Sequence, residues 1–374
     1  MLKNKNTKKL HIVAFDVPYP PNYGGVIDVF YKLKSLSQLG VEITLHTYEY
    51  GRGHAIELEK YCNKVHYYKR KKPYTDLFSR KPFIVKTRSS KKLMNRLLLD
   101  KNPILFEGLH TTFPLSFASF PERTILVRTH NIEHRYYDGL SKSDTRKRKK
   151  AFFKTESKKL ERYEAVLEKA DHLLTISPYE HEYFKQKYGA RAIYIPAFFE
   201  NKSLPLLETK EKFALWHGDL NVSDNRKALY KSIAMFKKTR HKLVVASSSI
   251  DPEILAAIAG HASISFEKIE SNEALEILFQ KAHIHILITF QKTGIKLRLL
   301  HCLTKGKFVI ANTKMIEDTG LESACLLANT DAEFKEGIER LFSLDFDNSH
   351  VELRKKLLAQ FNPLHNAKEI KKLL

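Results

Sequence analysis

Short apolar runs alternate with segments of helical period along the whole chain. The first such unit has a strand-like run at His11–Phe15, a helix-like segment at Val26–Leu39 and a second apolar run at Val41–Thr47. Apolar side chains recur through the middle segment at the spacing of an amphipathic helix, and Gly40 follows it directly. The order of strand, helix and strand predicts a βαβ unit, in which the two strands run parallel.

The same alternation continues to the end of the chain in two series. The first series predicts strands at Val65–Tyr68, Pro103–Glu107, Thr124–Thr129, His172–Ile176 and Ala192–Pro196, and helices at Ser89–Leu99 and Ser141–Ala170. The second predicts strands at Phe213–His217, Leu243–Ser247, Ile264–Phe266 and Phe308–Ala311, with helices at Pro252–Ala259 and Glu273–Lys281. The tail, Asn348–Leu374, is predicted to be helical with a kink at Pro363. Between the series, residues 199–212 read as a linker of mixed charge.

The length of the chain agrees with this division. At 374 residues it is long enough for two domains of ordinary size, and 43% of its residues are hydrophobic, as in globular proteins. We therefore predict two α/β, Rossmann-like, doubly wound domains that face each other across a cleft, with boundaries at 1–198 and 213–351. His283 and His285 alternate within a predicted strand and are interpreted as structural.

Cysteine usage and hydropathy bear on the compartment. The three cysteines, Cys62, Cys302 and Cys325, form neither a disulfide framework nor a metal-ligand spacing. No run of apolar residues is long enough for a membrane span, and the basic N-terminus lacks the apolar core and cleavage site of a signal peptide. We expect a cytoplasmic protein.

The second series contains the most informative stretch, Phe290–Asn312. An apolar run ends at Phe290, a short loop follows, and the next helix carries leucines along one face before Gly306 ends it in the manner of a C′ glycine. In βαβ units, ligands bind at the carboxyl end of the strand and the N-terminus of the helix. Residues of that region with cationic or small side chains are Lys292, Thr293, Gly294, Lys296 and Arg298. Cations beside free backbone N–H groups suit a diphosphate.

Glycines and histidines occupy equivalent positions in the first series. Gly24 and Gly25 precede a helix, where backbone can approach a ligand closely, although the dinucleotide fingerprint GxGxxG is absent. His110 and His130 follow two strands. Either histidine can act on a ligand, or can instead hydrogen-bond backbone at its strand end. In the second series Gly218 follows a strand, and Arg226 or Lys227 lies in the first turn of the next helix, where a cation can meet a phosphate.

These stretches together resemble family 4 glycosyltransferases, retaining enzymes with the GT-B fold, over nearly the whole chain. The residues that match the family's pattern around its second conserved Glu are Gly294, Lys296, Leu297, Arg298, Leu300, Leu303 and Gly306. The segment VRTHNIEHRYY resembles a bacterial subgroup engaged in polysaccharide or lipopolysaccharide biosynthesis. The chain departs from the pattern at both carboxylates of the E-x7-E region, since His301 stands for the second Glu and Thr293 for the first.

The resemblance implies a role for each matched residue. It implies a nucleotide-diphosphate sugar as donor, no metal or other cofactor, and a glycan or lipid-linked saccharide as acceptor. Lys296 and Arg298 would stabilise the leaving diphosphate, where negative charge develops, and His130 would position or stabilise the sugar. The remaining donor-side residues would be Gly24, Gly25, Gly218, Arg226, Lys227, Thr293, Gly294 and His301. On the acceptor side would be His110, Asn131 and Glu133. A C-terminal helix, 352–374, would cross back to complete the first domain.

The net charge of the chain bears on its partners. The chain carries +22 at neutral pH, which draws a protein to anionic partners such as nucleic acid, an anionic membrane or phosphate-bearing substrates. The segment Lys142–Lys150 is strongly basic and precedes Phe152 and Phe153. It can form a peripheral contact with the inner face of the cytoplasmic membrane, or it can be a solvated helix whose phenylalanines enter the core. No nucleic-acid-binding signature accompanies the charge, so we expect no nucleic-acid partner.

Four hypotheses for function remain open from the sequence. The first is an active glycosyltransferase. The second is a GT-B protein that binds a nucleotide sugar but is catalytically impaired, because both E-x7-E glutamates are replaced. The third, supported by charge alone, is a nucleic-acid-binding protein. The fourth is other GT-B chemistry, such as epimerisation.

Overall fold

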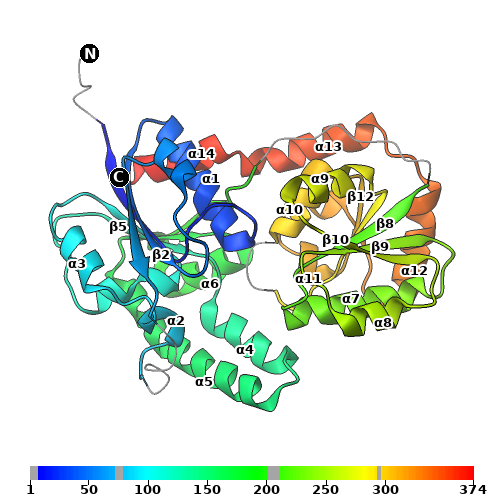
Figure 1. The fold of residues 1–374 in the computed structure, drawn as a ribbon. Helices are drawn as coiled ribbons and strands as arrows, with labels where there is room; N and C mark the ends of the chain where they lie inside the picture. Colours follow the sequence, from blue (N-terminus) through cyan, green and yellow to red (C-terminus); the bar gives the residue numbers. More distant parts are fainter. Residues whose placement is uncertain (1–6, 72–78, 201–210, 293–295) are drawn as a thin grey trace. The chain divides into compact units, whose positions relative to one another are not determined.

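The computed structural model describes residues 7–71, 79–200, 211–292 and 296–374, which divide into two compact units (Figure 1). Unit 1 consists of the residues up to Glu200 together with Phe361–Leu374, and unit 2 of the described residues between them. Each unit is a parallel sheet covered by helices on both faces, so the prediction of two doubly wound α/β units is confirmed.

Unit 1 contains a seven-stranded parallel sheet within its described residues. The strand order is β3 (Lys64–Lys69), β2 (Glu42–Glu49), β1 (Lys9–Ala14), β4 (Ile104–Glu107), β5 (Ile125–Thr129), β6 (His172–Thr175) and β7 (Ala192–Tyr194). The order reverses between β1 and β4, which pair in register from His11 with Ile104 to Val13 with Phe106. The carboxyl ends of strands at such a reversal are where doubly wound sheets bind ligands.

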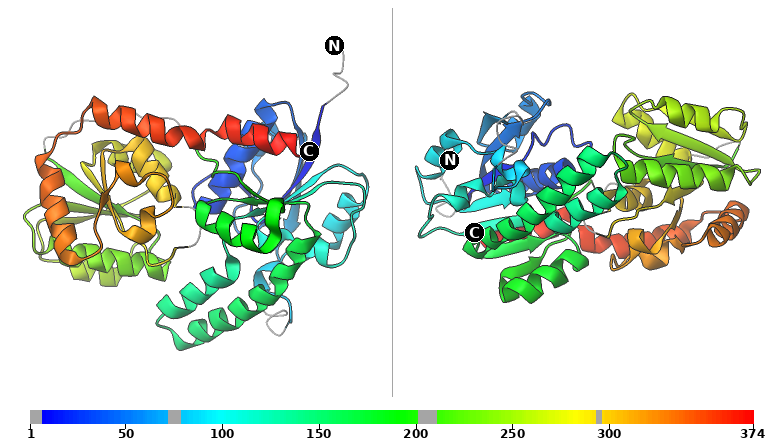
Figure 2. Two further views of the ribbon diagram at one scale, coloured as in Figure 1. Left: turned by 180° about the vertical axis from the view of Figure 1, so that it is seen from behind. Right: turned by 90° about the horizontal axis from the view of Figure 1, so that it is seen from below.

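Helices cover the two faces of this sheet separately. On one face lie α1 (Gly24–Gln38) and α14 (Pro363–Lys372), which pack against each other although they come from opposite ends of the chain. The helices of the other face are α2 (Phe83–Lys86), α3 (Lys91–Leu97), α4 (Glu133–Ser143), α5 (Lys147–Tyr163) and α6 (Pro178–Tyr188). Figure 2 shows α4 and α5, in blue-green and green, as an antiparallel pair.

Unit 2 repeats the architecture with a six-stranded sheet in its described part. The strand order is β10 (Ile264–Lys268), β9 (Lys242–Ser247), β8 (Phe213–His217), β11 (Ile284–Leu287), β12 (Phe308–Ala311) and β13 (Leu326–Leu327). The helices are α7 (Ser223–Phe236), α8 (Pro252–Ile258), α9 (Asn272–Lys281), α10 (Leu297–Lys305), α11 (Thr313–Ile316), α12 (Asp331–Ser343) and α13 (Asn348–Leu358). Here the strand order reverses between β8 and β11.

The long helix predicted at Ser141–Ala170 is wrong in its boundaries. The chain forms two helices, α4 and α5, which meet at Asp144. The Asp144 carboxylate accepts hydrogen bonds from the backbone and side chain of Arg146, and this local ring of contacts competes with a continuous helix. The predicted helical tail forms two helices, α13 (Asn348–Leu358) and α14, which are separated just before the predicted kink at Pro363. Asn362 accepts hydrogen bonds from two backbone N–H groups at the start of α14.

The predicted helix end at Gly306 is confirmed, but the predicted reason is wrong. Gly306 has φ −118° and ψ −173°, an extended conformation that does not require glycine. A Cβ atom at this position would lie 2.0 Å from Nε2 of His285, which is fully buried in the neighbouring strand. The close approach of the His285 ring therefore explains the glycine. His285 stacks on Phe279 and His283 hydrogen-bonds the Leu341 carbonyl, and both contacts belong to packing.

Candidate functional site

In unit 1, α1 begins at the glycine pair, directly after the loop that follows β1. A Cβ atom on Gly25 would lie 2.5 Å from Cζ of Phe15, so a larger residue here would displace the Phe15 ring. The same ring contacts His110 and His130, with centroid distances of 5.3 and 5.5 Å. Residues from three predicted positions, Gly25, His110 and His130, thus surround one aromatic side chain at the reversal of strand order.

His110 and Glu133 face each other without a hydrogen bond. Gly108 has φ +71° and turns the chain after β4, which places His110 Nδ1 3.8 Å from Glu133 Oε1. Both atoms are buried and have no partner among the described residues. Burial raises the pKa of the Glu133 carboxyl to about 7, against the opposing effects of Asn131 and Arg88. Burial also lowers the pKa of His110 well below its ordinary value, so its imidazole is neutral at pH 7.

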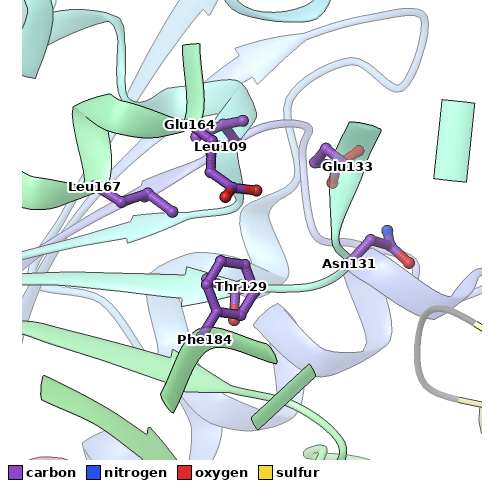
Figure 3. Close-up of a pocket in the computed structure, with 7 residues that line it drawn as sticks. All are labelled: Leu109, Thr129, Asn131, Glu133, Glu164, Leu167 and Phe184. Carbon is purple, nitrogen blue, oxygen red and sulfur yellow. The ribbon is translucent and has the colours of Figure 1, made fainter. Parts of the chain in front are cut away.

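A small cavity lies beside Glu133 at the start of α4 (Figure 3). Its volume is about 10 Å³, which is the space of a single water molecule. The side chains that line it are Leu109, Thr129, Asn131, Glu133, Glu164, Leu167 and Phe184. This cavity is too small for a sugar.

A buried chain of alternating charges lies beneath His130, and sequence reasoning missed it. Arg128 donates to Asp28, Lys32 donates to both Asp28 and Glu107, and His130 Nε2 lies 3.0 Å from Glu107 Oε2. The side chains of Asp28, Lys32, Glu107 and Arg128 have no exposed area. A signal was available in the sequence, because Asp28 and Lys32 lie four positions apart on the apolar face of a predicted helix.

The buried chain of charges is anchored to the backbone at its inner end. Arg128 donates to the carbonyls of Thr175, Ile195 and Pro196, and Asp28 accepts from the backbone N–H of Phe198. Burial opposes ionisation of Asp28, but Arg128 and Lys32 outweigh it and hold the pKa of this carboxyl below its ordinary value. The result is a buried, charge-balanced network beside the predicted site residue His130.

Asp28, Glu107 and His130 are also close enough to share a metal ion. The Lys32 ammonium, however, lies 2.8 Å from an oxygen of each carboxylate. A lysine cation already supplies the positive charge that a metal would bring. The residues present therefore fit a salt-bridge network rather than a metal centre.

In unit 2, Arg298 lies at the carboxyl end of β8. Its Nη1 donates to the carbonyl of His217 at 3.1 Å, and a Cβ atom on Gly218 would lie 3.2 Å from the same nitrogen. Burial lowers the pKa of Arg298, which nonetheless stays charged at pH 7. The structure thus brings together Arg298 and Gly218, two predicted donor-side residues from distant parts of the sequence. His217, between them, was missed.

The other predicted cations of unit 2 have different surroundings. Lys227, near the start of α7, places its ammonium 4.2 Å from the centroid of the Phe290 ring, at the loop that follows β11. Lys296 donates to the Gln291 carbonyl at 2.9 Å in the same loop. Arg226 is ion-paired with acidic residues at the start of α8. Of the two alternatives in α7, Lys227 is therefore nearer to the loop that precedes α10.

Three predicted donor-side positions remain. His301 lies on α10 and is half-buried. It is near His217, whose pKa is well below its ordinary value, chiefly because of burial and then because of the Arg298 charge. Thr293 and Gly294 fall outside the described residues. Asp224, in the first turn of α7, accepts from the Thr289 hydroxyl and the Phe290 N–H, which ties this turn to the end of β11.

Two parallel, doubly wound α/β units with these strand orders define the GT-B fold. Solved structures with the same fold include TarM, with a TM-score of 0.70, 11% identity and 99% of both chains covered. The lipopolysaccharide outer core galactosyltransferase WaaB aligns with a TM-score of 0.63, and OtsA with 0.65, each at 11% identity and 98% of this chain. At such identity the similarity shows the fold alone.

A curated protein of Klebsiella pneumoniae is related in sequence over most of both chains. It is named an uncharacterized 44.6 kDa protein in the cps region, and it is 24% identical over 368 residues, covering 88% of this chain and 90% of its own length. No protein-family model matches the chain.

Proposed function

We propose that the protein is a glycosyltransferase that moves a sugar from a nucleotide-sugar donor to a glycan acceptor. The observation that carries the proposal is Arg298 against Gly218 at the carboxyl end of β8, with Lys227 and Lys296 at the same edge of the sheet. Cations at this edge suit the diphosphate of a nucleotide sugar. Among the structural neighbours, a TarM mutant was solved with UDP and alpha-GlcNAc-glycerol, and a plant UGT with UDP.

The donor site can be tested by thermal shift with a panel of nucleotides and nucleotide sugars. A ligand at a hundredfold excess over its Kd adds about 2.7 kcal/mol of stability. Arg298→Met should abolish the stabilisation by the active nucleotide. Lys242→Met is the matched control, because Lys242 begins β9 at the opposite, amino edge of the same sheet. Equal stabilisation of the two variants would contradict the assigned site, and no response to any nucleotide would contradict the proposed function.

The second candidate function is a GT-B protein that binds a nucleotide sugar without transferring it. One observation favours it: His301 and Thr293 occupy the positions at which family 4 glycosyltransferases have the two glutamates of the E-x7-E region. His301 can offer one or two hydrogen bonds to a ribose hydroxyl, where a Glu accepts two. A nucleotide sugar that stabilises the protein but gives no transfer to any oligosaccharide acceptor would favour this function over the first.

Retention of anomeric configuration and independence of metal belong to the same proposal. They follow from the resemblance to family 4 enzymes, in which His130 would position the sugar rather than act as a nucleophile. The anomeric configuration of the product, read by NMR, tests the first point. Turnover in the presence of a chelator tests the second, and loss of turnover that added Mg²⁺ restores would contradict it.

We further propose that the acceptor is lipid-linked and that α5 brings unit 1 to the inner face of the cytoplasmic membrane. Lys147, Arg148, Lys149 and Lys150 are all exposed at the start of this helix. Phe152 and Phe153 are half-buried and contact each other and aromatic rings of unit 1, so they supply no apolar anchor. The contact would therefore be electrostatic. Among the described residues, no helix combines the length and apolar character needed to cross a bilayer.

A further inference from the structure

The contact between Glu107 and His130 bears on the position of the His130 ring and on which of its nitrogens carries the proton. Glu107 ends β4 and His130 follows β5, and these strands pair in parallel register up to Glu107 with Arg128. The His130 ring is held from the other side by the edge-to-face contact with Phe15. Only one of its ring nitrogens, Nε2, has a hydrogen-bond partner among the described residues, and that partner is Glu107.

The protonation of Glu107 is determined by its other partner. Both of its oxygens accept from the Lys32 ammonium, at 2.8 and 2.9 Å, and neither residue has exposed side-chain area. Burial opposes ionisation of Glu107, but Lys32 and His130 outweigh it, so the pKa of the carboxyl is below its ordinary value. An ionised carboxylate only accepts hydrogen bonds. His130 Nε2 must therefore carry the proton, and in the neutral ring Nδ1 is left with a lone pair.

We propose that Glu107 is a positioning residue that holds His130 in its Nε2–H tautomer and so makes Nδ1 a hydrogen-bond acceptor. This inference rests on the proposed function for its consequence, which concerns the ligand. A neutral Nδ1 accepts from a hydroxyl group of a sugar, whereas a phosphate oxygen would meet it lone pair to lone pair. His130 would therefore recognise a sugar hydroxyl, and the phosphates would be left to other residues.

Glu107→Gln is the informative substitution, because an amide has one accepting oxygen and one donating NH2 group. The Lys32 ammonium can only donate, so it takes the amide oxygen. When the amide oxygen takes the position of Oε1, the NH2 group faces His130 Nε2, which must become an acceptor, and the proton moves to Nδ1. When the oxygen takes the position of Oε2, it accepts from both Lys32 and His130, and the tautomer is kept. The variant should thus release the tautomer while nearly preserving the shape of the side chain. A corresponding change at the position of a triad aspartate is known to give the wrong histidine tautomer.

The tautomer can be read by long-range ¹H–¹⁵N NMR of the full chain labelled at histidine, with His130→Asn used to identify the signals. We expect Nε2–H in the wild type, an added population of Nδ1–H in Glu107→Gln and Nε2–H alone in Asp28→Asn. Asp28 is the matched control, because it is a carboxylate of the same buried chain that pairs with Lys32 and is not hydrogen-bonded to His130. A wild-type Nδ1–H tautomer, a wild-type ring protonated on both nitrogens, or an equal Nδ1–H population in the two variants would overturn the proposal. The wild-type spectrum decides even if a variant fails to fold.

A double-mutant cycle then connects the tautomer to turnover. Loss of a hydrogen bond with an unpartnered buried group left behind should lower kcat/KM at least about tenfold in Glu107→Gln. In the His130→Asn background the same substitution should cost almost nothing, because Glu107 acts through His130. An equal cost in both backgrounds would overturn the positioning role. Because the NMR measurement uses no substrate, absence of turnover with every nucleotide sugar would contradict the proposed function and leave the tautomer result standing.

Discussion

Lys32 provides the sharpest test of the buried charge chain in unit 1. Its ammonium has no exposed area and lies 2.8 Å from oxygens of both Asp28 and Glu107. Lys32→Met fills a similar volume, so the packing loss is small, but it leaves two buried carboxylates without their shared cation. Removal of one partner of a buried ion pair costs about 3–5 kcal/mol. For a unit of this size, that corresponds to a fall in Tm of roughly 10 °C.

The pH dependence of that loss has a defined sign. The pKa values of Asp28 and Glu107 are below their ordinary values in the folded protein, so their stabilising contribution is present above about pH 4 and falls as the pH decreases through the folded values. Without Lys32 these pKa values rise, and either carboxyl can escape its unpaired charge by binding a proton. The difference in unfolding free energy between variant and wild type should therefore be largest near pH 7 and shrink toward acid pH.

Urea unfolding at several pH values measures this difference. Far-UV circular dichroism follows both units, while the fluorescence of the single tryptophan, Trp216, reports on unit 2 and separates its transition from that of unit 1. Lys34→Met, a half-buried lysine on the same helix, is the control and should stay within about 0.5 kcal/mol of wild type. A loss below about 1 kcal/mol for Lys32→Met, or a loss that grows on acidification, would refute the reasoning.

Three further outcomes are expected. Glu133 has a pKa of about 7 in the folded protein, above its ordinary value, so its ionisation destabilises the fold as the pH rises; Glu133→Gln should add about 3 kcal/mol at pH 8 and nothing at pH 4, measured by urea unfolding. Lys296→Ala should cut turnover about a hundredfold with the true donor, and unchanged turnover would remove Lys296 from the diphosphate site. Neutralisation of four cations in Lys142–Lys150 should lower sedimentation with anionic vesicles and leave nucleotide affinity unchanged; a parallel fall in both would place the segment at the donor site instead.

The fold was accessible from the sequence because it depends on period and order. Buried parallel strands appear in the sequence as short apolar runs. The helices between them show apolar residues every three to four positions, so both sheets could be predicted. Helix breaks depend on single contacts, and the interruption at Asp144 required knowledge that its carboxylate binds Arg146. The reason for a glycine at position 306 could not be predicted either. His285 lies about twenty residues away in the sequence, and its ring contacts Gly306 only after the sheet has formed.

The candidate site was only partly accessible, for a different reason. Residues at the carboxyl ends of strands could be named from topology, and the structure does bring Gly25, His110 and His130 around Phe15. The charges that support them were harder to predict. Asp28 and Lys32 leave a local signal, because both lie on the apolar face of one predicted helix, but Glu107 leaves none. Its partner Lys32 is 75 positions away, and no local pattern distinguishes a buried, paired glutamate from a solvent-exposed one.

The two units differ in how they treat charge, and the difference bears on which part of a nucleotide sugar each could bind. In unit 1, Arg128 and Lys32 are fully matched by Asp28 and Glu107, so the site beneath His130 is neutral and offers hydrogen bonds rather than net attraction. In unit 2, Arg298 donates a hydrogen bond to a backbone carbonyl and forms no salt bridge with a described residue, although the Asp224 carboxylate is near enough to favour its charge. A cation without a salt bridge attracts a diphosphate, whereas a neutral acceptor selects a hydroxyl. The proposed assignment of phosphate to unit 2 and of a sugar hydroxyl to unit 1 therefore has an electrostatic basis that is independent of any sequence motif.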